Sequence, residues 1–124
     1  MKILIPLLSK EENKPEFLEK AAGNGRHITL LTVIDTHSGK EKFGFAASQI
    51  GSCSSLAEEI RDKLRESVAD VDYIMEWGDT LTKIEQIAEL KKIDSIVLKR
   101  QQNQFFEELV KQLQLRKLNV EVVD

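Results

Sequence analysis

Two adjacent cations, Lys99 and Arg100, are the residues best suited to chemistry, and they directly follow a short apolar run at residues 95–98. Such side chains bind phosphate and carboxylate groups, arginine through a planar two-pronged contact and lysine as a point charge. Ser9 follows the first apolar run, residues 2–8, and could exchange a hydrogen bond with a ligand. These residues indicate an anion site. The plainer alternative is a solvated loop in which the polar groups satisfy the local backbone.

The other reactive side chains do not suggest a catalytic or metal site. His27 and His37 flank one predicted strand and lie roughly 30 Å apart at about 3.3 Å per residue, so they cannot share a metal. Cys53 is the single cysteine, which excludes an internal disulfide, and we expect an inert thiol. The neighbouring carboxylates Glu11 and Glu12 should diverge. No H-E-x-x-H motif or Ser-His-Asp order occurs, so we expect no enzyme, no metal and no cofactor.

Length and composition restrict the possible partners. The 124 residues fit one domain spanning 1–124, and a hydrophobic fraction of 41% suffices for a core. The net charge is −3, and acidic and basic residues are mixed along the chain, so we expect no nucleic-acid partner and no membrane-surface binding. The apolar start is too short for a signal peptide, and no run approaches the roughly 20 residues that span a bilayer. A cytoplasmic location is therefore expected.

Short apolar runs alternate with amphipathic helical patterns. Strands are predicted at residues 2–8, 27–34, 71–77, 95–98 and 120–123, with the third near an edge because its apolar residues alternate. Helices are predicted to begin at Pro15, at a capping box on Ser55, at Asp79 or Thr80, and at Phe105. Strands joined by helices run parallel with helices on both faces. The fold class is therefore a three-layer α/β open sheet, and the long segment 36–53 is expected to be functional or mobile.

Each predicted helix has an apolar stripe that should face the sheet. In the last helix the stripe is expected to include both Phe105 and Phe106. The other expected core residues of the helices are Phe17, Leu18, Ala21, Ala22, Leu56, Ile60, Leu64, Leu81, Ile84, Ile87, Ala88, Leu109, Val110 and Leu113.

Ordered segments also carry a family resemblance. Residues 30–35 read Leu-Leu-Thr-Val-Ile-Asp, and residues 77–80 read Trp-Gly-Asp-Thr ahead of a helix and the run Ile-Asp-Ser-Ile-Val-Leu at 93–98. With the opening strand, these segments resemble the universal stress protein family over nearly the whole chain. The resemblance implies a five-stranded parallel sheet of order 3-2-1-4-5. It also implies a homodimer that pairs through the last strand, with Val120, Val122 and Val123 at the interface.

The phosphate-binding loop of that family does not match. ATP-binding members have an Asp at the end of the first strand and G-x-x-G-x9-G-[ST] after the fourth. Here Leu8 stands at the first position, Lys99 and Gln102 stand at the first two glycine positions, and no glycine follows Gly78. A phosphate nest built from glycine backbone is therefore not expected.

Ligands of such sheets bind at the carboxyl ends of the strands, in the crevice between the first and fourth strands. The candidate ligand-binding residues are Leu8, Ser9, Val33, Asp35, Gly78, Lys99 and Arg100. The favoured interpretation is a non-enzymatic regulatory or stress-response domain that does not bind ATP in the usual way. The alternative is a nucleotide- or anion-binding protein that uses Lys99 and Arg100. A receiver-like domain with Asp79 as phosphoacceptor lacks the acidic cluster near the first strand.

Overall fold

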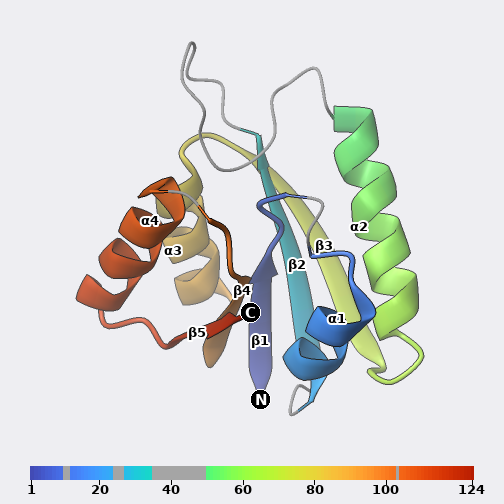
Figure 1. Ribbon diagram of the computed structural model, residues 1–124. Helices are drawn as coiled ribbons and strands as arrows, with labels where there is room; N and C mark the ends of the chain where they lie inside the picture. Colours follow the sequence, from blue (N-terminus) through green and yellow to red (C-terminus); the bar gives the residue numbers. More distant parts are fainter. Residues whose placement is uncertain (10–11, 24–26, 35–49, 103) are drawn as a thin grey trace.

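Within the described residues, five parallel strands form one sheet in the order β3-β2-β1-β4-β5 (Figure 1). The computed structural model describes residues 1–9, 12–23, 27–34, 50–102 and 104–124, with backbone only at Ile50, Ser52 and Cys53. The elements along the chain are β1 (Lys2–Pro6), α1 (Pro15–Ala22), β2 (His27–Ile34), α2 (Ile50–Leu64), β3 (Asp70–Trp77), α3 (Thr80–Leu90), β4 (Ser95–Lys99), α4 (Gln104–Leu115) and β5 (Val120–Val123).

Helices cover both faces of the sheet, α1 and α2 on one and α3 and α4 on the other (Figure 1). Because successive side chains of a strand point to opposite faces, β1 sends Ile3 and Ile5 toward α1 and α2 and Leu4 toward α3 and α4. Phe17 and Phe106 are the largest side chains buried on the two faces. The predicted three-layer architecture, its strand order and the edge position of β3 are confirmed.

The first strand ends earlier than its apolar run. We predicted residues 2–8, but β1 stops at Pro6, which has no N–H to continue a ladder. Leu7 still donates its backbone N–H to the Leu31 carbonyl at 2.8 Å. Leu7 joins the α1 and α2 core and Leu8 joins the α3 and α4 core. The apolar run is therefore longer than the strand, because Leu7 and Leu8 are buried without being part of it.

The start predicted for α2 is wrong. The helix begins at Ile50, so Ser55 lies inside it and caps nothing at its end. Glycine and serine are tolerated in a helix at a cost of about 1 kcal/mol or less each. Packing of the fully buried Ala57 and Ile60 offsets that cost. Of the long segment 36–53 that was expected to be functional or mobile, residues 36–49, which include His37, lie outside the described residues.

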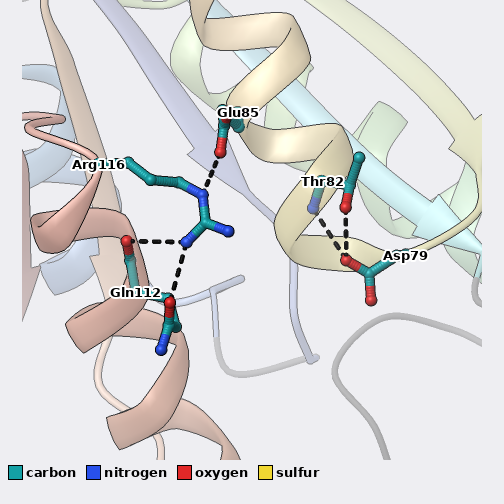
Figure 2. Close-up of polar contacts among 5 residues, drawn as sticks. All are labelled: Asp79, Thr82, Glu85, Gln112 and Arg116. Carbon is teal, nitrogen blue, oxygen red and sulfur yellow. Dashed lines mark hydrogen bonds and ion pairs between the residues drawn. The ribbon is translucent and has the colours of Figure 1, made fainter.

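The α3 and α4 helices are joined by polar contacts (Figure 2). Asp79 caps α3 as predicted, accepting from the Thr82 N–H at 3.0 Å and from its hydroxyl at 2.9 Å. Arg116 near the end of α4 forms an ion pair with Glu85 of α3. Its guanidinium also donates to the Gln112 carbonyl at 3.2 Å and to the Gln112 side chain at 3.0 Å. Of the contacts drawn in Figure 2, the Arg116–Glu85 ion pair joins the two helices, whereas those of Asp79 and Gln112 are local to the start of α3 and the end of α4.

One predicted core residue lies at the surface. Phe105 is 48% exposed, whereas Phe106, Leu109 and Leu113 are buried. Successive residues of a helix are about 100° apart, so Phe105 points away from Phe106 and lies at the edge of the buried stripe. None of the helices in the described ranges is both long and apolar enough to cross a membrane.

Candidate functional site

The order of the strands reverses between β1 and β4, and the two strands separate there. Their pairing covers Ile3 with Ser95 and Leu4 with Ile96, whereas β4 continues alongside β5 as far as Lys99. The loops that follow β1 and β4 therefore face each other across the carboxyl ends of these strands. This is the place where an open parallel sheet binds its ligands.

A buried carboxyl group lies at this position. Glu12, in the loop between β1 and α1, has no exposed surface. One of its oxygens accepts from the Ser9 backbone N–H at 2.9 Å, and the Ser9 hydroxyl lies 3.4 Å and 3.5 Å from the two oxygens. The Gln101 side-chain amide, from the loop after β4, donates to Glu12 Oε2 at 3.3 Å. Glu12 therefore connects the two loops across the crevice.

Gln101 is itself oriented by a second contact. Its Nε2 also donates to the Lys99 carbonyl at 3.1 Å, so the amide group is held at the end of β4. A side-chain amide has two N–H donors, and one acceptor lies on each side of the crevice. The orientation of Gln101 thus matches the position of Glu12.

Burial changes the acidity of Glu12. Removal from water raises the pKa of Glu12 from 4.5 to about 7. Hydrogen bonds from the Ser9 hydroxyl and from the backbone at Leu8, Ser9 and Glu12 lower the pKa and only partly offset the effect of burial. Among the described residues no cation forms an ion pair with this carboxyl group. Near neutral pH the group is therefore divided between its neutral and ionised forms.

The predicted ligand-binding residues lie in different surroundings. Leu8 and Val33 are buried in the core that faces α3 and α4. Gly78 lies at the turn after β3 with a φ of +141°, and its N–H donates to the Ile34 carbonyl at 2.9 Å. Only Ser9 of these residues contacts the Glu12 carboxyl group through its side chain. Asp35 lies outside the described residues.

The two predicted cations differ in their contacts. Lys99 ends β4 and is partly buried. Arg100 forms an ion pair with Asp124 and has a guanidinium nitrogen 3.9 Å from a Glu107 oxygen. Its backbone N–H donates to the Val123 carbonyl at 2.8 Å. Arg100 is therefore directed toward the carboxyl terminus and α4.

Sequence reasoning missed Glu12 and Gln101. Both lie in polar loops, where neighbouring residues give no periodicity that would indicate burial. The adjacent carboxylates of Glu11 and Glu12 were expected only to diverge, and the contact with Gln101 is seen only once the two loops approach in space. Among the described residues, no group of three or more His, Cys, Asp or Glu side chains could hold a metal ion.

Solved structures share this architecture. A universal stress protein in complex with cAMP superposes with a TM-score of 0.68 at 13% identity, over 100% of this chain and 97% of that one. A hypothetical protein superposes with a TM-score of 0.58 at 22% identity, over 98% of this chain and 94% of that one. No family model and no curated protein matches the sequence. The chain thus has the universal stress protein fold, as its sequence resemblance predicted.

Proposed function

We propose that this chain is a non-enzymatic regulatory or stress-response domain of the universal stress protein type that does not bind ATP in the usual way. The supporting observation is the contact between the buried Glu12 carboxyl group and the Gln101 amide, which bridges the crevice between β1 and β4. A backbone phosphate nest needs glycines that let N–H groups approach the ligand, and the loop after β4 has none.

The proposed absence of catalysis follows from the chemistry at the crevice. The Ser9 hydroxyl lies beside Glu12, and a carboxyl group can act as a base. However, both groups are held in contacts within the protein, and Glu12 has no exposed surface from which to meet a substrate. We therefore assign the domain a regulatory function in the cytoplasm.

The alternative function is nucleotide or anion binding through Lys99 and Arg100. In its favour, a structural neighbour is a complex with cAMP. Against it, the Arg100 guanidinium contacts Asp124 and Glu107, so it would have to leave two carboxylates to bind a phosphate. For that reason we place this alternative second.

Nucleotide titration distinguishes the two functions. Thermal unfolding should be measured with ATP, ADP, AMP and cAMP, each with and without magnesium. A ligand at about 100 times its dissociation constant stabilises the folded state by about 2.7 kcal/mol, a shift of several degrees. We expect no shift. A shift that disappears in the double variant Lys99→Ala and Arg100→Ala would establish the alternative. Exposed Lys20 and Lys111 provide the matched double alanine control.

The domain is further proposed to be a homodimer paired through β5. This strand is at the edge of the sheet and reads Val-Glu-Val-Val, with one charge inside it to discourage pairing. The carbonyls of Asn119 and Val123 accept from β4, so the alternate residues Val120 and Val122 direct their backbone groups to the open edge. Val123 is buried against the α1 and α2 face. We therefore expect it to support the proposed interface by holding Val122 in place rather than by contacting the second subunit directly.

A further inference from the structure

Glu12 receives the contacts that the crevice would offer an external anion. The Ser9 N–H and the Gln101 side-chain amide both donate to its oxygens, and a backbone hydrogen bond at Leu8 adds to them. Converging amide donors of this kind bind phosphate and carboxylate ligands in other proteins. Here the acceptor is supplied by the chain itself.

This internal occupant is poorly matched electrostatically. A buried carboxylate is stable when a cation pairs with it, and among the described residues none does so for Glu12. Lys99 ends β4 and Arg100 directly precedes Gln101, yet Arg100 is directed to Asp124 instead. The Glu12 contact is therefore held by neutral donors only, and releasing the carboxylate to water recovers its hydration.

We propose that Glu12 is a tethered occupant that closes an oxyanion site in the β1–β4 crevice, a proposal that rests on the proposed regulatory function. When the Glu12 side chain turns away from the crevice, the donors at Ser9 and Gln101 become available. A phosphate or carboxylate group then takes the vacated position. The binding-competent state is the open one, and Glu12 keeps its population low.

The population of the open state sets the effect of removing Glu12. An apparent affinity is lowered by the fraction of molecules that are competent to bind. If fewer than about a tenth of the molecules are open, Glu12→Ala should bind an anion at least about tenfold more tightly than the unaltered protein. Glu12→Gln keeps the size of the side chain but has one accepting oxygen where Glu12 uses two, so its gain in affinity should be smaller than that of Glu12→Ala.

The test is calorimetric titration of the full chain with AMP, and separately with inorganic phosphate, at pH 8. Binding of AMP alone would mean that the base and ribose are needed, and binding of both would mean that the oxyanion suffices. Glu12→Asp serves as a second variant, because its shorter side chain weakens the contact with the Gln101 amide and leaves both donors of the site in place. It should give a gain in affinity smaller than that of Glu12→Ala.

The outcomes separate this proposal from the proposed function. Weak binding by the unaltered protein with a gain of about tenfold or more in Glu12→Ala supports both. Weak binding by every variant overturns the tethered occupant and leaves the regulatory function standing. Tight AMP binding by the unaltered protein overturns the proposed function. In that case a further gain in Glu12→Ala still supports the occupant, and an unchanged affinity overturns it. If Glu12→Ala fails to fold, the Glu12→Asp result decides in the same way.

Discussion

Gln101 Nε2 lies 3.3 Å from Glu12 Oε2, although 89 positions separate the two residues in sequence. The contact joins the loop after the central strand to the loop after its neighbour, at the only reversal of strand order within the described sheet. The buried carboxyl group gives this contact a pH dependence, which provides the first prediction.

Glu12 should make the protein less stable as the pH rises. Its pKa is about 7 in the folded state against 4.5 as the ordinary value, so the folded state binds more protons between these limits. The free energy of unfolding therefore falls as the pH rises from about 4.5 to about 7. The difference corresponds to about 3 kcal/mol at about 1.4 kcal/mol per tenfold change. Urea denaturation across this range should show the fall.

Glu12→Gln tests the origin of this dependence. The glutamine side chain has nearly the same size and cannot ionise. The free energy of unfolding of this variant, relative to that of the unaltered protein, should therefore rise with pH and level off above about 7. Glu58→Gln on the exposed face of α2 is the matched control and should leave the profile unchanged. A Glu12→Gln profile parallel to that of the unaltered protein would show that Glu12 is not the titrating group.

Gly78→Ala should destabilise the turn between β3 and α3. The φ of +141° disfavours any side chain, and an added Cβ would lie 3.0 Å from Lys83 Cε. We expect a loss of about 1–3 kcal/mol in the free energy of unfolding. Gly51→Ala is a control for which we expect an effect of the opposite sign, because Gly51 lies in α2 and an added Cβ would have open space around it. It should stabilise the protein by up to about 1 kcal/mol. Equal effects of the two changes would contradict this account.

Asp79→Ala should weaken the start of α3. The change leaves the Thr82 N–H and hydroxyl without the carboxylate that caps them (Figure 2). The expected loss is about 1 kcal/mol, measured by chemical denaturation. Asp79→Asn retains an accepting oxygen and should recover most of the stability. The prediction fails if both variants lose the same amount.

Val122→Pro should convert the proposed dimer into a monomer. Proline has no N–H to offer at the open edge, and the alternation along β5 leaves the ladder with β4 intact. Light scattering on the unaltered protein should give a dimer mass, and on Val122→Pro a monomer mass. Val122→Ile should remain dimeric. A dimer that persists in a folded Val122→Pro protein would place the interface elsewhere.

Most of the fold was predictable because its signals are local. The strand at residues 27–34 and the Asp79 cap are confirmed at the predicted residues. Strands buried on both faces are continuous apolar runs, and caps have their own chemistry, so short windows suffice. Two predictions failed, the helix start at Ser55 and the burial of Phe105. In both cases packing against the sheet, rather than a local sequence signal, decides where the helix begins and which residues it buries.

The site was less predictable because its contacts are not local. Lys99 and Arg100 are charged and adjacent to a strand, which indicated an anion site, but the sequence cannot show that Arg100 turns toward Asp124. The sequence likewise contains no sign that Glu12 is buried. Its burial depends on Gln101, which approaches only once β1 and β4 are side by side.

The short segment after β4 has neighbours on both sides. Gln101 contacts Glu12 on the crevice side, while the next residue along the backbone, Arg100, contacts Val123 and Asp124 at the end of β5. The two residues share one peptide unit, so a shift of the Gln101 backbone would also displace the Arg100 carbonyl. A ligand that displaces Glu12 and shifts Gln101 would then alter the β5 edge, and binding in the crevice would change the association of two subunits.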